Sequence, residues 1–523
     1  SKTVLFQGQD RTWVAFREAL RGVLEKQRNA GGAGVRFLSG RTTSPTLAAQ
    51  REALRAELPE ARWVSWEPAD RDNVREGAKL AFGEAVEPQY RFENADVILS
   101  LEADFVTGHP ASLRLVREYA SRRKVDDAKP EMNRLYVVEG SPTPTGASAD
   151  HRLAIRSSAI EGFARAVAAG LGLADEGGVD HEWVAPLAKD LKRAGARALV
   201  VAGETQPPAV HALAHAMNEA LGAVGTTVVY TEPAELPGDV SLENLVSEMK
   251  AGVVDLLVVM GANPVYAAPA DLGFAEALDR VPLRVHYGLS LDETAERCQW
   301  HLPAAHPLES WSDARAACGT ASIVQPLIAP LYGGLSAHEL VGAFIEDSEA
   351  KGYDIVRAHW AEVLGDDDEF EAKWSQALHD GVVAGTASPE QAVAVTPGEW
   401  MRTASPRVSG LEIAFRTDPG VFDGRFANLG WLQELPRPLT KLTWDNAALM
   451  SPKTAERLGG FRIEETGAGH VTEVVELKYQ GRSVRAPVWI LPGHPDGSVT
   501  VHLGFGRSRA GRVGDGVGFD AYA

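Results

Sequence analysis

The stretch Val253–Pro264 reads VVDLLVVMGANP. Its first eight residues are apolar except for Asp255 and rich in β-branched valine, which predicts a buried strand. Gly261 ends the run, and Asn263 and Pro264 follow it. Open α/β sheets bind ligands just beyond the carboxyl ends of their strands, so Gly261, Asn263 and Pro264 are candidate ligand-loop residues. A turn that only ends the strand is the simpler explanation for the same residues.

Similar short apolar runs occur on the N-terminal side of this stretch. Strands with helical stretches between them predict parallel sheets joined by right-handed crossovers. We therefore expect two doubly wound α/β units. The first unit is predicted to contain strands 35–39, 95–101 and 135–138 and helices 47–58, 112–124 and 160–173. The second is predicted to contain strands 198–202, 226–230, 253–260 and 283–286 and helices 209–221 and 245–250.

The last third of the chain has a different texture. Residues 346–395 are charged and helical in pattern, which favours an exposed helical insertion that returns to the first domain. From about residue 396, short alternating runs separated by Gly, Pro and Asp predict a small β-barrel. The predicted fold class is α/β, and the predicted domains are 1–180 (the N-terminally truncated first half of a cleft), 181–345, 346–395 and 396–523.

Composition excludes several kinds of partner. The chain has 523 residues, 52 basic against 71 acidic, and a net charge of −19. This balance argues against nucleic-acid binding and against docking on anionic lipid by charge alone. No apolar run approaches the roughly 20 residues of a membrane-spanning helix. The chain begins on SKTVLF without Met, so we expect it to be a fragment whose targeting signal is missing.

The common catalytic and cofactor motifs are missing from the sequence. Its two cysteines, Cys298 and Cys318, cannot hold an iron–sulfur cluster by themselves and form no C-x₂-C zinc motif. There is no G-x-x-x-x-G-K-[ST] loop, no G-x-G-x-x-G after a strand, and no G-x-S-x-G elbow. We therefore predict no catalytic residue.

A second candidate site lies in Arg297–Asp313, which reads RCQWHLPAAHPLESWSD. Four of its residues could bind a metal or act as acids and bases. However, the two histidines are five residues apart and two prolines interrupt any helix between them, unlike the i, i+4 pair of H-E-x-x-H. Hydrogen-bonded structure is the favoured interpretation, and no metal site is predicted. The four candidates are His301, His306, Glu309 and Asp313.

Ordered motifs along most of the chain resemble the molybdopterin oxidoreductase family. They comprise G-x-N-P at 261–264, D-E-T-A at 292–295, Leu-Pro at 302–303, L-E-x-W-x-D at 308–313 and Q-P-x-I-x-P at 325–330. Residues 95–110 and 138–164 resemble the first cofactor-binding half, and 427–459 and 486–507 resemble the C-terminal barrel. The resemblance implies two doubly wound domains around a cofactor cleft and a small barrel.

The sequence departs from that family where the redox chemistry should lie. The four-cysteine cluster domain is missing, and the position of the metal ligand, near residues 62–77, holds no cysteine. Ser65 is the only oxygen ligand available there, and only if a metal is present. The family's Ala-Asp before Leu-Pro is replaced by Cys298-Gln299. We therefore expect no bound cofactor in this chain.

This combination is similar to the molybdopterin-oxidoreductase-like part of the iron–sulfur subunit of alternative complex III. Residues 44–50, 67–84, 132–153 and 301–316 carry that narrower resemblance. It implies a cofactor-free scaffold in a respiratory, quinol-oxidising electron-transport complex. The expected partners are a ferredoxin-like iron–sulfur domain that carries the clusters, cytochrome c subunits and integral membrane subunits. The expected location is the periplasmic side of the bacterial inner membrane, after export by a twin-arginine signal.

In such a scaffold, polar residues of a vestigial cleft would bond to one another, because each buried unpaired polar group costs about 1–3 kcal/mol. Gly261, Asn263, Pro264, His301, His306, Glu309 and Asp313 are the residues expected in that cleft. Two alternatives remain open. One is an active, polysulfide-reductase-like enzyme with molybdenum or tungsten on molybdopterin guanine dinucleotide. The other is a non-redox interaction module.

Overall fold

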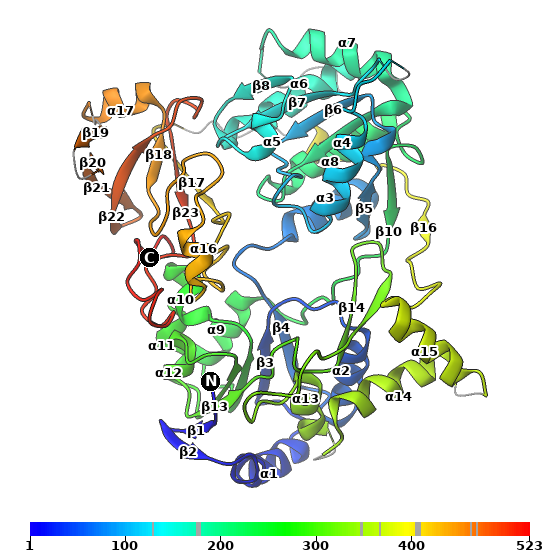
Figure 1. The fold of residues 1–523 in the computed structure, drawn as a ribbon, viewed down its shortest axis with the longest axis vertical. Coiled ribbons are helices and arrows are strands. Elements are labelled where there is room, and N and C mark those ends of the chain that lie inside the picture. Colours follow the sequence, from blue (N-terminus) through cyan, green and yellow to red (C-terminus); the bar gives the residue numbers. More distant parts are fainter. Residues whose placement is uncertain are drawn as a thin grey trace. The chain divides into compact units, whose positions relative to one another are not determined.

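The computed structural model describes residues 1–127, 130–173, 179–345, 349–365, 368–402, 409–460, 463–466 and 469–523. The chain divides into two compact units (Figure 1). Unit 1 consists of Ser1–Pro68, Ala234–Ser388 and Tyr522, and unit 2 of Ala69–Pro233, Pro389–Ala521 and Ala523. The chain therefore passes from unit 1 into unit 2 after Pro68, returns to unit 1 at Ala234, and enters unit 2 again at Pro389. The four domain segments expected from the sequence stay a prediction.

Unit 1 is built on a seven-stranded sheet in the order β2-β1-β13-β12-β11-β3-β4. Five neighbouring strands, from β13 to β4, are parallel. Strand order reverses between β3 and β11, which is the position where such sheets bind ligands. Figure 1 shows blue β3 and β4 in the same sheet as green β13. The strands are β1 (Val4–Phe6), β2 (Gln9–Arg11), β3 (Val35–Ser39), β4 (Arg62–Ser65), β11 (Leu256–Met260), β12 (Leu283–Gly288) and β13 (Trp300–Pro303).

Both faces of this sheet are covered, which explains why β11 is apolar at every position. Leu256 and Val258 join one buried cluster, which includes residues of α1, α2 and α13. Leu257 and Val259 join another, which includes residues of α9 and α11. The helices of this part of unit 1 are α1 (Trp13–Asn29), α2 (Pro45–Glu57), α9 (Leu242–Lys250), α10 (Pro264–Ala267), α11 (Phe274–Leu278), α12 (Glu293–Glu296) and α13 (Ala337–Ile345).

A hairpin and two helices complete unit 1. Strands β14 (Ser312–Arg315) and β15 (Ala321–Val324) pair antiparallel, and α14 (Gly352–Leu364) and α15 (Phe370–Asp380) follow. Trp360 of α14 is fully buried in a cluster with Ile323 of β15. The expected helical segment is therefore helical, but it packs on the hairpin and is not wholly exposed. Residues 346–348 and 366–367 of that segment lie outside the described residues.

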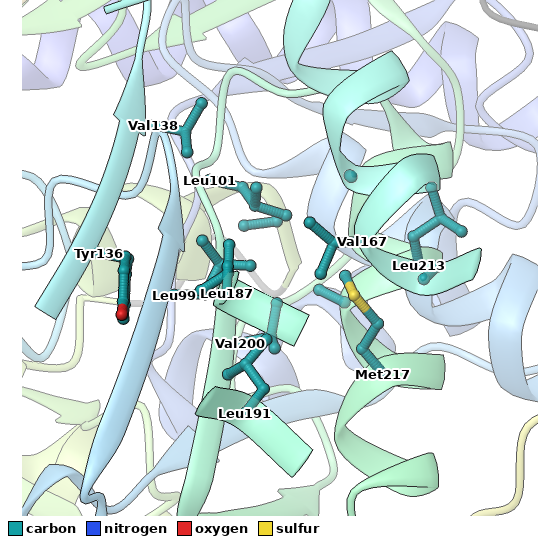
Figure 2. Packing of buried hydrophobic residues seen from close by; sticks show 14 of the residues in the cluster. Leu99, Leu101, Tyr136, Val138, Val167, Leu187, Leu191, Val200, Leu213 and Met217 are labelled. Atoms are coloured by element: carbon teal, nitrogen blue, oxygen red, sulfur yellow. The ribbon is translucent and has the colours of Figure 1, made fainter. Parts of the chain in front are cut away.

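Unit 2 contains a four-stranded parallel sheet in the order β8-β7-β6-β9. Leu99, Val200 and Val167 belong to the cluster on one face of it, drawn in Figure 2. A three-stranded sheet, β16-β10-β5, contributes to the cluster on the other face. The strands are β5 (Glu87–Tyr90), β6 (Val97–Leu101), β7 (Arg134–Glu139), β8 (His151–Ala154), β9 (Ala198–Ala202), β10 (Val228–Thr231) and β16 (Glu390–Gln391).

The grouping of strands differs from the sequence expectation. β3 pairs with β11 and not with β6, while β9 pairs with β6. The strands were predicted correctly, but their grouping was not. β3, expected in the first unit, belongs to the sheet of β11, and β9, expected in the second unit, belongs to the sheet of β6, because pairing depends on burial between segments far apart in the chain. The helices of unit 2 are α3 (Asp72–Phe82), α4 (Ser112–Ser121), α5 (Pro144–Ala147), α6 (Ile160–Leu171), α7 (Val184–Ala194), α8 (Pro208–Ala220), α16 (Gly430–Glu434) and α17 (Pro452–Leu458).

The C-terminal part of unit 2 is a five-stranded sheet in the order β17-β23-β18-β22-β21, with a separate hairpin, β19–β20. Among the described residues, no pairing joins β17 to β21, so the closed barrel expected from the sequence is not confirmed. No helix in the described part of the chain has the length and apolar character needed to span a membrane. The strands are β17 (Glu412–Arg416), β18 (Ala448–Met450), β19 (Ile463–Thr466), β20 (Gly469–Thr472), β21 (Val474–Tyr479), β22 (Arg482–Ile490) and β23 (Ser498–His502).

Candidate functional site

The G-x-N-P turn lies at the carboxyl end of β11, beside the reversal of strand order. Gly261 has a φ of +66°, a conformation that favours glycine. The Asn263 side chain is engaged on both sides by α12. Its Nδ2 donates to Glu293 Oε2 at 2.7 Å, and its Oδ1 accepts from the Thr294 hydroxyl at 2.7 Å. The amide therefore fixes α12 against this turn, and Pro264 begins the short helix α10.

His301 is a buried residue of β13, directly opposite His286 of β12. Their Nδ1 atoms lie 2.9 Å apart, so one ring donates and the other accepts. His286 Nε2 lies 3.3 Å from Asp292 Oδ1. Burial and the neighbouring His286 lower the pKa of His301 to about 3. His301 is therefore neutral at physiological pH and forms part of the sheet's interior.

His306 and Glu309 shape one exposed loop. The His306 backbone N–H donates to Glu309 Oε2 at 3.1 Å, and His306 Nδ1 accepts from the backbone N–H of Leu308 at 3.1 Å. Glu309 Oε1 also accepts from the backbone N–H of Leu331 at 3.3 Å. His306 therefore holds a turn of its own loop, and Glu309 also ties this loop to the segment that contains Leu331.

Asp313 lies in β14 and is 3% exposed. Its carboxylate accepts from the Trp360 indole at 2.9 Å, from the Thr46 hydroxyl at 2.5 Å and from the Thr46 backbone N–H at 3.2 Å. The Ser44 hydroxyl donates to it as well. Ser44 is the N-cap of α2, so Asp313 places a negative charge at the N-terminus of that helix, where the helix dipole favours it.

Ser65 ends β4, at the same carboxyl edge of the unit 1 sheet. Its hydroxyl is buried, and it has no hydrogen-bond partner among the described residues. The four candidates from Arg297–Asp313 therefore do not form one cluster. His301 lies in a strand, His306 and Glu309 lie in a loop, and the Asp313 side chain lies at the N-terminus of α2. Among the described residues, no three His, Cys, Asp or Glu side chains are grouped so that they could hold a metal ion.

An extended polar site in unit 2 was missed from the sequence. Glu102 follows β6 directly, has a φ of +60°, and is 8% exposed. Its Oε1 accepts from the Gly140 backbone N–H at 3.0 Å and lies 2.7 Å from Arg416 Nη2. Its Oε2 accepts from the Ser157 hydroxyl at 2.5 Å and from the Gln206 amide. The donors come from four separate parts of unit 2.

The position of Glu102 is the reversal point of the unit 2 sheet, because β6 lies between β7 and β9. Burial opposes ionisation of Glu102, but Arg416 and the bonds from Ser157 and Gln206 outweigh it and lower its pKa. The charged carboxylate therefore occupies the edge where an α/β sheet would bind an anionic ligand.

A second buried carboxylate stands beside it. Glu139, the last residue of β7, is 1% exposed. It accepts from the Thr143 hydroxyl at 2.6 Å and from Arg152 Nε at 2.5 Å. Burial raises its pKa, even though Thr143 and Arg152 act in the opposite direction. A glutamate placed directly at the end of a strand-like run, as in VILSL-E and RLYVV-E, was the available sequence signal for both residues.

Comparison with known proteins defines the class. The chain has a molybdopterin-oxidoreductase-like fold and superimposes on the solved structure of acetylene hydratase from Pelobacter acetylenicus. That match has a TM-score of 0.70 and 11% sequence identity, and it covers 100% of this chain and 88% of the hydratase. No protein-family model matches the chain.

A curated relative agrees with this class. The chain is 25% identical over 292 residues to the menaquinone reductase, molybdopterin-binding-like subunit, of Nitratidesulfovibrio vulgaris. The alignment covers 54% of this chain and 41% of that protein, so the chain spans well under half of the relative's length. Both comparisons support the molybdopterin-oxidoreductase-like fold that the ordered sequence motifs predicted.

Proposed function

We propose that this chain is a cofactor-free, molybdopterin-oxidoreductase-like scaffold of a respiratory, quinol-oxidising membrane complex. It supports a separate ferredoxin-like iron–sulfur domain, which passes electrons toward a periplasmic acceptor. Cytochrome c subunits and integral membrane subunits are its other partners. The chain lies on the periplasmic side of the inner membrane and reaches it through a twin-arginine signal.

The observation that carries the proposal is the buried carboxylate of Glu102 at the reversal point of the unit 2 sheet. Its hydrogen-bond donors are those that an anionic ligand would otherwise use: a backbone N–H, two polar side chains and Arg416. Asp313 plays a related part in unit 1, where it accepts from the first turn of α2, the helix after β3. In unit 2 the Glu102 carboxylate thus accepts from the donors at the reversal point of the sheet, and in unit 1 the Asp313 carboxylate accepts from the N-terminus of α2.

The residues around Glu102 do not fit a pyrophosphate-linked pterin dinucleotide at this position. Such a cofactor carries negative charge and needs free N–H donors at helix N-termini or basic side chains. A second anion beside Glu102 would meet like charge in a buried site, where repulsion is strong. Binding would require Glu102 to leave Arg416 or to become protonated. The proposal therefore assigns no electron-transfer role to a pterin at this site.

The curated relative supports the setting of this proposal. Its description names a menaquinone reductase and a molybdopterin-binding-like subunit, which combines a quinone-linked complex with a pterin-type fold. The word "reductase" names the opposite direction of quinone chemistry from the quinol oxidation proposed for this chain. The direction is therefore a separate point that enzymology of the complex must test.

One observation favours a second candidate function, an active molybdenum or tungsten oxidoreductase. The buried Ser65 hydroxyl has no hydrogen-bond partner among the described residues and lies at the carboxyl edge of the unit 1 sheet. A serine oxygen there could ligate a metal. The occupied donors around Glu102 speak against a dinucleotide at the reversal point of the unit 2 sheet, so the scaffold is the stronger proposal.

The decisive experiment is to isolate the protein with its native partners by an affinity tag. Molybdenum and tungsten would be measured by mass spectrometry, pterin by fluorescence after oxidation, and co-purifying subunits by peptide sequencing. We expect substoichiometric metal and pterin, together with an iron–sulfur polypeptide and cytochrome c. Stoichiometric pterin with either metal would overturn the proposal, and its loss in a Ser65→Ala variant would assign the ligand. Isolation without any redox partner would instead support a non-redox interaction module.

A further inference from the structure

A cavity of about 480 Å³ lies in unit 1, and neither His286 nor His301 lines it. One wall is the face of α2 that carries Ala48 and Arg51, and another is the loop with Leu236. Arg315, at the end of β14, and Val363 of α14 line it as well. This volume lies within the range of about 300–1,000 Å³ that is typical of small-molecule sites.

The cavity contains a buried guanidinium with few partners. Arg51 is 8% exposed and stacks 5.1 Å above the Trp63 ring. Of its side-chain nitrogens, Nη2 donates to the Pro237 carbonyl at 3.0 Å, and the nearest carboxylate oxygen, on Asp239, is 3.8 Å away. Within the described residues, Nε and Nη1 make no hydrogen bond. Burial lowers the pKa of Arg51, although Asp239 opposes this effect.

The other polar groups that line the cavity also favour binding of an anion. Arg315 donates through Nη1 to two backbone carbonyls, and its remaining guanidinium nitrogens make no hydrogen bond to the described residues. His359 Nε2 is buried and has no hydrogen-bond partner in the part of the chain that the structure describes. The acidic lining residues, Glu52 and Asp239, are both paired with Arg55, at 2.6 and 2.7 Å. Two guanidiniums therefore retain donors toward a cavity whose carboxylates are already engaged.

We propose that this cavity binds a small anion with a short apolar body, held through a carboxylate or phosphate group by Arg51 and Arg315. Guanidinium groups bind such anions in a bidentate geometry that matches their planar donors. The alanines of α2, together with Leu236 and Val363, would contact the apolar part of the ligand. The two guanidiniums are not among the groups that bind Glu102 or Asp313, although Ser44, which donates to Asp313, lines the same cavity.

Calorimetric titration of the purified protein at constant ionic strength tests this site, with inorganic phosphate, succinate and neutral succinamide as probes. We expect saturable binding of phosphate or succinate and none of succinamide. The preference between the two anions distinguishes a phosphate ligand from a carboxylate ligand. Arg315→Gln and Arg51→Gln should each weaken binding at least tenfold. Arg62→Gln, an exposed position outside the lining, is the matched charge control and should leave affinity unchanged.

Because Arg51 also stacks on Trp63, its variant could fail to fold, so Val363→Trp provides a second variant. It fills the cavity from an exposed helix position without altering any charge, and it should also weaken binding at least tenfold. The proposal is overturned if neither anion binds saturably. It is equally overturned if Arg315→Gln and Val363→Trp both bind as tightly as the parent protein.

Discussion

Glu102 Oε1 and Arg416 Nη2 lie 2.7 Å apart, although their residues are separated by 314 positions in the chain. The glutamate side chain is 4% exposed and the arginine side chain 20% exposed. This ion pair ties the end of β6 to the end of β17, and it joins the sheet core of unit 2 to its C-terminal strands.

Glu102→Gln should destabilise the protein by about 3 kcal/mol, because removal of one partner of a buried pair leaves the other charge uncompensated. Urea unfolding followed by circular dichroism measures the change. Glu84→Gln, at an exposed position, is the matched control and should alter stability by less than about 0.5 kcal/mol. Equal stability of Glu102→Gln and the parent protein would show that the pair contributes nothing to the fold.

The same pair predicts an acid-sensitive step. The folded-state pKa of Glu102 is lowered from its ordinary value of 4.5, against the effect of burial, by Arg416, Ser157 and Gln206. Its stabilising contribution is therefore present above pH 4.5 and is lost as the pH falls through the lower folded-state pKa. Unfolding free energies of Glu102→Gln and the parent protein should therefore converge progressively as the pH falls below 4.5. A constant difference at all pH values would contradict this assignment.

Asp313→Asn should cost about 2 kcal/mol, since the amide cannot accept all the hydrogen bonds that reach the carboxylate from Ser44, Thr46 and Trp360. The loss should also weaken the N-terminus of α2. Urea unfolding measures the change, with the exposed Asp10→Asn as its control. If the two substitutions have the same small effect, Asp313 does not organise this helix terminus.

Two glycine substitutions should have opposite signs. A Cβ at Gly203 would lie 2.0 Å from the backbone oxygen of Glu102, so Gly203→Ala must displace backbone and should cost about 3 kcal/mol. Gly22 lies inside α1 with open space around it, and Gly22→Ala should stabilise by about 0.5–1 kcal/mol. Thermal and urea unfolding give both values. Tolerance of Gly203→Ala would mean that β9 and Glu102 are less closely packed.

The buried His301 leads us to expect a second pH dependence of the free energy of unfolding, at higher pH than that of Glu102. Burial and His286 lower its folded-state pKa from 6.5 to about 3, so the native state holds it neutral. Between pH 6.5 and 3, His301 binds a proton in the unfolded state but not in the folded state. The free energy of unfolding therefore falls as the pH drops below 6.5, by about 3 kcal/mol at pH 4. His301→Gln should flatten the pH profile of unfolding over this range, whereas the exposed His379→Gln should not. Parallel profiles for parent and His301→Gln would refute the prediction.

The sequence predicted some parts of the site better than others. The G-x-N-P turn does lie at the carboxyl end of β11, because a buried strand closed by glycine is a local pattern. Asp313 is buried and hydrogen-bonded, but its partners lie in α2 and α14, far from it in the chain. Glu102 was missed because a glutamate after a strand is only a weak local signal, and Arg416 and Gln206, which bind its carboxylate, lie far from it in the chain.

The sequence by itself determined the apolar runs that became strands, the helices between them, and the ordered motifs of a molybdopterin-oxidoreductase-like fold. These features depend on neighbouring residues and their periodicity. Only the tertiary structure decided that β3 pairs with β11 and β6 with β9, and that carboxylates satisfy the donors at both sheet edges. Strand pairing and buried charge compensation depend on which distant segments exclude water together, and that information is not present in any local stretch.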